Sequence, residues 1–184
     1  MKKNYWITLF MVGGILISSC SSDDDNPVAV NEEEVITTLT VTLTPVGDGE
    51  VITLQSRDLD GDGPNPPVIT VSGSLSGNTT YNGSIVLLNE TVSPPEDITE
   101  EVAEEADEHQ FFFTTTGPIE SINATDTDAN GNPVGINFEL TTFTAGPATI
   151  AITLRHEPKK PNDGTLADAG GETDIAQTFS VLVQ

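Results

Sequence analysis

The sequence is poor in positive charge and in aromatic side chains. Only 6 Lys and Arg stand against 29 Asp and Glu, so the formal net charge is −23. Such a surface repels phosphate backbones and anionic head groups, which excludes nucleic-acid binding and favours cationic partners and divalent ions. Aromatic residues make up 5% of the chain, and its single Trp is Trp6. A sugar-binding platform of stacked rings is therefore not indicated.

Motifs of common catalytic sites are also missing. The chain has no G-x-S-x-G, no H-E-x-x-H and no phosphate-cradling glycine loop. Its paired carboxylates are too frequent to indicate glycosidase chemistry, which needs a cleft that so small a domain rarely has. We therefore expect a protein that is not an enzyme.

The single cysteine, Cys20, excludes an intramolecular disulfide. It ends a segment that starts with Lys2 and Lys3 and continues with an apolar run over Ile7–Ile17. That run gives about 16 Å of helix, well short of the ~30 Å core of a bilayer. The segment is thus typical of an export signal and not of a transmembrane helix.

Residues 17–20, Ile-Ser-Ser-Cys, resemble the lipobox of bacterial lipoproteins. The resemblance implies that residues 1–19 are a signal peptide and that Cys20 is acylated, palmitate included, and becomes the mature N-terminus. Several acyl chains anchor a protein stably, whereas one is marginal. The alternative is an ordinary secretory signal with an incidental Cys.

Residues 20–34 are polar, acidic and unpatterned, so we expect the lipidated Cys to be followed by a flexible tether. The run Ser-Asp-Asp-Asp at 22–25 resembles the acidic export signal of lipoproteins in Bacteroidetes-type bacteria. That resemblance implies display on the outer face of the outer membrane. A plain linker on a periplasm-facing lipoprotein is the alternative.

Residues 35–184 form one predicted domain with a β pattern. Apolar residues alternate with polar ones, many of them Thr, in runs bounded by Gly, Pro, Asn and Asp. About eight or nine strands are expected, around Leu39–Leu43, Ile52–Leu54, Ile69–Val71, Tyr81–Leu88, Phe111–Phe113, Ile119–Thr125, Ile136–Phe143, Ile150–Leu154 and Phe179–Val183. The predicted fold is all-β, an antiparallel sandwich with an immunoglobulin-like or related Greek-key layout. A domain of this size can bury a core without a metal or disulfides, so no cofactor is required for folding.

Two segments depart from the β pattern. Residues 96–108 hold eight acids, and Ile98, Val102 and Ala106 recur at helical spacing, so a short acidic helix or a surface excursion is predicted there. The segment between Leu154 and Ile175 is predicted to be a solvated loop. Its basic residues are Arg155, Lys159 and Lys160.

Two Asp-rich turns have the start of a calcium-binding loop, because carboxylates at alternate positions can converge on one cation. The candidate ligands are Asp58, Asp60 and Asp62 in the first turn, and Asp126, Asp128 and Asn130 in the second. Neither turn has the bidentate Glu at its twelfth position, which excludes an EF-hand. Plain turns are the alternative, since Asp, Asn and Gly favour turns in their own right.

Both histidines have acidic neighbours in the sequence. Strand alternation places His109 on the face of Phe111 and His156 on the face of Leu154. If these faces point to the core, both imidazoles lie on the core side at a strand end. Histidine with carboxylates suits zinc or copper. The candidate set is Glu108, His109, His156 and Glu157, and two unrelated surface histidines are the alternative.

Several stretches together resemble small flavobacterial lipoproteins that are often labelled "type 1 periplasmic binding fold superfamily protein". They are residues 20–25 (Cys-Ser-Ser-Asp-Asp-Asp), 31–38, 56–64, 108–110 (Glu-His-Gln) and 154–158 (Leu-Arg-His-Glu-Pro). The label implies two doubly wound α/β lobes, whereas the strand pattern predicts an antiparallel sandwich. No established activity comes with the resemblance.

These observations lead to an expected function. We expect a lipid-anchored, non-enzymatic binding module at the outer membrane that presents acidic loops to a cation or to an outer-membrane protein partner. One alternative is a structural or adhesive surface lipoprotein with calcium-rigidified loops. Another is a zinc or copper capture protein accessory to outer-membrane uptake.

Overall fold

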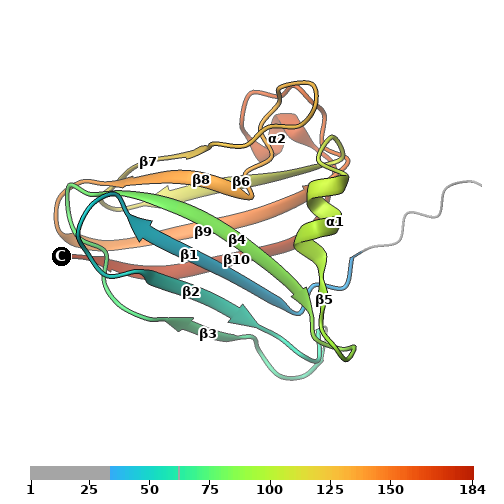
Figure 1. The fold of residues 1–184 in the computed structure, drawn as a ribbon, viewed down its shortest axis with the longest axis horizontal. Helices are drawn as coiled ribbons and strands as arrows, with labels where there is room; N and C mark the ends of the chain where they lie inside the picture. Colours follow the sequence, from blue (N-terminus) through green and yellow to red (C-terminus); the bar gives the residue numbers. More distant parts are fainter. Residues whose placement is uncertain (1–33, 62) are drawn as a thin grey trace, which may run out of the picture. The chain divides into compact units, whose positions relative to one another are not determined.

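The computed structural model describes residues 34–61 and 63–184. The signal peptide, Cys20, most of the predicted tether and Asp62 lie outside these described residues. Within them, ten strands and two short helices follow one another (Figure 1). Their bounds are β1 Thr38–Pro45, β2 Ile52–Arg57, β3 Val68–Val71, β4 Thr80–Asn89, β5 Glu96–Asp97, α1 Ile98–Glu104, β6 His109–Thr116, β7 Ile119–Ala124, β8 Asn137–Thr142, β9 Gly146–His156, α2 Leu166–Ala169 and β10 Glu172–Val183.

The strands form two antiparallel sheets. The larger has the order β3-β2-β1-β4-β8-β7, with β5 paired to β4, and the smaller has the order β10-β9-β6. The spatial order β4-β1-β2-β3 is that of a Greek key. Figure 1 shows the two sheets stacked as layers, with α1 at one end of the sandwich.

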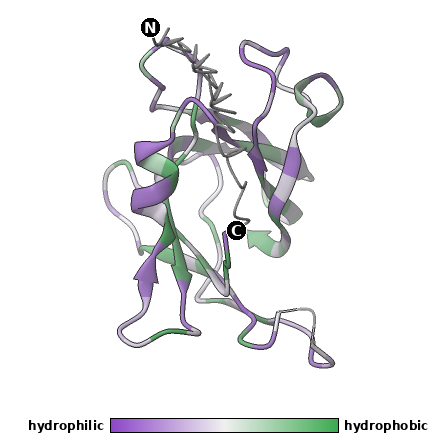
Figure 2. Cartoon of the chain, turned by 90° about the vertical axis from the view of Figure 1, so that its right-hand side faces the viewer, coloured by the Kyte–Doolittle hydropathy of each residue, from purple (hydrophilic) through white to green (hydrophobic). Residues whose placement is uncertain are grey.

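Alternation along the strands builds the core between the sheets. In β1, Leu39, Val41 and Leu43 are buried, and in β9, Ile150 and Ile152 are buried in the same way. Each such side chain contributes about 1.5–3 kcal/mol when it leaves water. Figure 2 shows hydrophobic residues along the strands and hydrophilic residues on the helix and in loops.

The acidic segment forms helix α1 for local reasons. Asp97 caps its N-terminus, because its side chain accepts a hydrogen bond from the backbone N–H of Thr99. Ile98 and Val102 are buried and bind the helix to the sandwich, while Glu100 and Glu104 face solvent. The Thr99 hydroxyl accepts from the N–H of Leu87 at 2.9 Å, which fixes the helix beside β4.

The predicted all-β sandwich and the helix near 96–108 are confirmed, and the α/β lobes implied by the label are absent from the described residues. Three details were wrong. There are ten described strands and not eight or nine, α2 lies inside the predicted loop, and β9 and β10 extend into both ends of that loop. Neither described helix has the length and apolarity needed to cross a bilayer.

Candidate functional site: a buried histidine–carboxylate cluster

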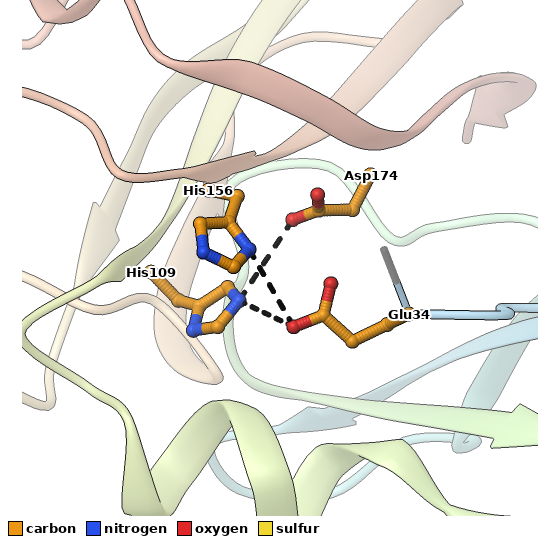
Figure 3. Close-up of side chains that lie close together, drawn as sticks. All are labelled: Glu34, His109, His156 and Asp174. Carbon is orange, nitrogen blue, oxygen red and sulfur yellow. Dashed lines mark hydrogen bonds and ion pairs between the residues drawn. The ribbon is translucent and has the colours of Figure 1, made fainter. Parts of the chain in front are cut away.

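The two histidines lie side by side on the core face of the smaller sheet. His109 begins β6 and His156 ends β9, and the antiparallel register sets them directly opposite each other. Their ring centroids are 4.6 Å apart, in an edge-to-face arrangement. Both are buried: His109 is 0% exposed and His156 is 6% exposed. Strand alternation thus brings both imidazoles together inside the rim of the sandwich (Figure 3).

A β-bulge in β10 supplies a carboxylate to this pair. Thr173 pairs with Arg155 and Ile175 pairs with Leu154, so Asp174 is an extra residue between two ladder pairs. Bulges redirect side chains and are frequent beside functional sites. The side chain of Asp174 is 3% exposed, and its Oδ2 lies 4.0 Å from Nε2 of His109.

Glu34 supplies the second carboxylate from the segment that precedes β1. Its Oε1 lies 2.9 Å from Nε2 of His109 and 3.6 Å from Nδ1 of His156. The Glu34 side chain is 7% exposed. Two imidazoles and two carboxylates from four separate segments therefore meet in one buried cluster, which we call the inner site: Glu34, His109, His156 and Asp174.

The tautomer of His109 is fixed by its surroundings. Its Nδ1 lies 3.2 Å from the carbonyl oxygen of Glu105. A carbonyl can only accept a hydrogen bond, so this Nδ1 carries a proton and Nε2 is turned toward Glu34. The 2.9 Å between Nε2 and Oε1 is a hydrogen-bond distance, so a proton joins the two atoms where no metal ion does.

The carboxylates of the inner site are poorly satisfied by the protein. Oε2 of Glu34 and Oδ2 of Asp174 are buried without a hydrogen-bond partner among the described residues. Burial, together with the neighbouring charge of Glu34, raises the pKa of Asp174 to about 6, while His109 and His156 oppose the shift. Buried polar oxygens are normally paired, so these two carboxylate oxygens are free to serve as ligands of a cation.

The ligand atoms are arranged for a small cation. One atom from each of the four residues lies within 4.8 Å of the others. A tetrahedral zinc ion with bonds of ~2.1 Å sets its ligand atoms about 3.4 Å apart. The three distances of 2.9, 3.6 and 4.0 Å lie on both sides of that value. The cluster could therefore hold a metal ion.

A groove leads from the surface to the carboxylate side of the inner site. Its volume is about 420 Å³, and Glu34 and Asp174 line its inner wall. Asp58 and Gly61 of the first Asp-rich turn, together with Pro67, also line it. Water or an ion can therefore approach the inner site from this side.

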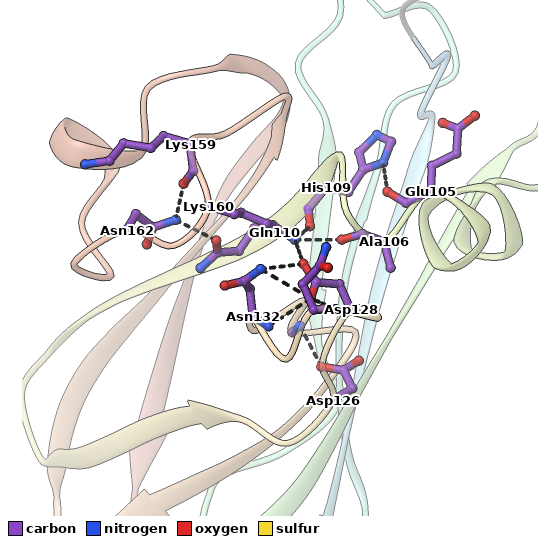
Figure 4. Close-up of polar contacts among 12 residues, drawn as sticks. Glu105, Ala106, His109, Gln110, Asp126, Asp128, Asn132, Lys159, Lys160 and Asn162 are labelled. Atoms are coloured by element: carbon purple, nitrogen blue, oxygen red, sulfur yellow. Dashed lines mark hydrogen bonds and ion pairs between the residues drawn. The ribbon is translucent and has the colours of Figure 1, made fainter.

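Lys160 supports the site from behind His109. Its side chain is 6% exposed, and its ammonium group donates to the carbonyl oxygens of Ala106 and His109, both at 2.6 Å (Figure 4). It also lies 3.5 Å from Oδ2 of the fully buried Asp128 side chain. Burial lowers the pKa of Lys160, while the charge of Asp128 opposes that shift. Lys160 lies in the predicted loop, but its side chain is buried and not solvated as the sequence suggested.

The residues of the second Asp-rich turn act as turn acceptors. Oδ1 of Asp128 accepts from the backbone N–H groups of Asn130 and Asn132, and the Asp126 carboxylate accepts from the N–H groups of Gly135 and Asn137. Burial alone would raise the pKa of Asp128, but the hydrogen bonds and Lys160 hold it below its usual value. Both carboxylates thus already have protein partners.

The first Asp-rich turn is exposed. Asp60 accepts from the side-chain amide of Asn65 at 2.7 Å, and Asp58 accepts from the N–H of Asp60. Asp62 lies outside the described residues. None of the calcium candidates belongs to a cluster of three or more converging His or carboxylate ligands in the described part of the chain.

The transition-metal candidates divide into two groups. His109 and His156 meet as the pattern suggested, but their partners at the inner site are Glu34 and Asp174. Glu108 and Glu157 lie on the exposed side of His156, where they form a second cluster with it. Glu34 was predicted to be part of the flexible tether, but its side chain is buried against His109. Asp174 was predicted to be in the loop before Ile175, but it lies in β10.

No protein-family model, curated protein or solved structure matches this chain. Its function has to be inferred from the chemistry of the inner site.

Proposed function

We propose that this chain is a lipid-anchored protein that captures a divalent transition-metal ion, with zinc as the reference ion, at the inner site. The observation that carries the proposal is the contact between Nε2 of His109 and Oε1 of Glu34, beside two orphaned carboxylate oxygens. Two imidazoles with two carboxylates are a ligand set that suits zinc and copper. Calcium prefers six to eight oxygen ligands, which this cluster does not offer.

The proposal favours binding over catalysis for a geometric reason. Catalytic zinc sites keep one coordination position open for water or substrate, whereas four protein ligands close a tetrahedral shell. The inner site offers four protein ligands. The carbonyl of Glu105 holds the His109 ring in the orientation that a metal ligand needs.

Zinc should raise the melting temperature of the purified full chain, kept in mild detergent with any affinity tag removed. Free zinc at about 100 times its Kd adds ~2.7 kcal/mol, which corresponds to about 5–10 °C for a chain of this size. The variants His109→Gln and His156→Gln should each lose this rise. Differential scanning calorimetry measures the shift, and far-UV circular dichroism checks that each variant folds.

The matched control is Asp58→Asn with Asp60→Asn, which removes a half-buried and an exposed acid of the first turn that are not members of the inner site and should leave the zinc response intact. An equal zinc response in His109→Gln and in the original chain would overturn the proposal. If calcium raises the melting temperature and the Asp58/Asp60 variant loses this rise, the chain is instead a structural protein with calcium-rigidified loops. Copper tested in parallel decides which ion binds more tightly.

The anchor is the second part of the proposal and rests on the lipobox at residues 17–20. The original chain should partition into the detergent phase of a cloud-point extraction, and Cys20→Ala should move it to the aqueous phase.

Outer-face display predicts that protease added to whole cells removes the domain. Changing Asp23, Asp24 and Asp25 to Ala should protect it. Continued digestion of this variant would mean that the acidic run is only a linker.

A further inference from the structure

His156 faces two different groups of carboxylates through its two ring nitrogens. Nδ1 points to the inner site, 3.6 Å from Oε1 of Glu34, whereas Nε2 lies 4.0 Å from Oε2 of Glu108. Glu157 completes this second group, and its three ligand atoms lie within 4.8 Å of one another. We call Glu108, Glu157 and Nε2 of His156 the outer site.

The outer site combines an unpartnered buried ring with accessible acids. The His156 side chain is 7% exposed, and neither of its nitrogens makes a hydrogen bond within the described residues. The Glu108 side chain is 53% exposed, and Glu157 is exposed as well. A largely buried imidazole whose Nε2 is aimed at a solvated carboxylate at 4.0 Å has the placement of a cation ligand.

Backbone contacts hold the two acids together. The N–H of Glu157 donates to the carbonyl oxygen of Glu108 at 2.7 Å, so the end of β9 is joined to the residue before β6. Glu157 has a φ of +47°, a conformation that a residue other than Gly rarely adopts. The two acids are therefore held at the same end of the smaller sheet as both histidines.

We propose that the outer site captures the metal ion at the surface and delivers it to the inner site through His156. This inference rests on the proposed function. A neutral imidazole has one lone pair, so His156 binds a cation through Nε2 or through Nδ1 but not through both. When the ion passes from Nε2 to Nδ1, Nδ1 releases its proton to water in the groove and Nε2 takes one proton from water at the outer site, so the ring stays neutral. The outer and inner sites then fill one at a time, and the chain holds one tightly bound ion.

The burial of the two sites sets the direction of transfer. The outer site has three ligands and open solvent, whereas the inner site has four ligands in a medium of lower dielectric. Attraction between a cation and carboxylates is stronger where water is excluded. The ion is accordingly held weakly outside and tightly inside, while the acidic surface raises the rate of its first encounter.

The test is the rate of zinc uptake by the full chain, followed by stopped flow as zinc leaves a chromophoric chelator. The double variant Glu108→Gln/Glu157→Gln should slow uptake about tenfold while the equilibrium Kd changes by less than about threefold, because capture and release slow together. The matched control Glu100→Gln/Glu104→Gln removes the same charge from the exposed face of α1. It should keep a rate within about twofold of the original.

Other outcomes have distinct meanings. An unchanged rate in the Glu108/Glu157 variant overturns the proposal, and slower uptake in Asp58→Asn alone assigns entry to the groove instead. A large loss of equilibrium affinity in the Glu108/Glu157 variant also overturns it, because these acids would then belong to the tight site. If the original chain takes up no zinc, the proposed function itself fails.

With Asp174→Asn in the inner site, weak and rapidly exchanging zinc should persist and should vanish when Glu108 and Glu157 are also changed.

Discussion

Asp174→Asn should stabilise the metal-free protein at pH 8 and at the same time eliminate tight zinc binding. The two effects have opposite signs because Asp174 is a poor structural residue and a good ligand. Without a metal, its Oδ2 is buried without a hydrogen bond and stands close to the charge of Glu34. An Asn amide carries no charge and can donate a hydrogen bond to Glu34, but it cannot replace a carboxylate as a zinc ligand.

The stability gain should depend on pH in a defined window. The folded protein raises the pKa of Asp174 from 3.8 to about 6. Between these values the folded state holds a proton that the unfolded chain releases, so the metal-free protein loses stability as the pH rises through the window. The Asn side chain does not titrate, so the variant does not lose stability in this pH window. The variant should thus match the original chain below pH 4 and exceed it by about 1–2 kcal/mol above pH 6.

Urea unfolding of both proteins at pH 4 and pH 8, with and without zinc, measures this difference. Glu172→Gln is the control, because Glu172 is an exposed acid two residues away and outside the inner site. It should change stability by less than about 0.5 kcal/mol and keep the zinc response. An Asp174→Asn variant that is less stable than the original chain at pH 8 would mean that Asp174 has a structural role.

The fold could be predicted because its strands obey a simple period. In β1 and β9 every second residue is apolar and buried, and an antiparallel sandwich with one wet face needs this pattern. Helix α2 was missed because Leu166–Ala169 is only four residues long, too short to show a helical period. Strand β5 has two residues and carries no period at all.

Of the candidate site, only the residues that lie on regular strands could be predicted from the alternation of the sequence. The parity of β6 and β9 predicts the inward direction of both histidines, whereas the pairing of β6 with β9 that sets them opposite each other is known only from the structure. Asp174 is itself the extra residue of a bulge, which breaks the parity that a period-two pattern relies on. Glu34 precedes β1 in a stretch without regular structure, and nothing local separates it from the acids before it. Glu108 lies in the turn before β6 and Glu157 follows the end of β9, so strand alternation does not predict the direction of either side chain.

Lys160→Met should destabilise the protein strongly, although the sequence places this residue in a loop of Pro, Gly and Asp. Its ammonium group joins the carbonyls of Ala106 and His109 to the buried Asp128. Met fills a similar volume but leaves two buried carbonyls without this donor and Asp128 without its cation. Breaking a buried charge pair in this way costs about 2–4 kcal/mol of unfolding free energy.

Lys159→Met is a nearly ideal comparison because it removes the same charge one residue earlier. Lys159 pairs with Asp168 at the surface, where its side chain is 61% exposed, so its loss should cost less than about 1 kcal/mol. Zinc affinity gives the second measurement. Since Lys160 holds the backbone of His109, its replacement should weaken zinc binding by about tenfold, as outer-shell changes at metal sites do. Equal unfolding free energies for the two variants would show that the buried pair adds nothing. An unchanged zinc Kd in Lys160→Met would show that the backbone of His109 is held in place without Lys160.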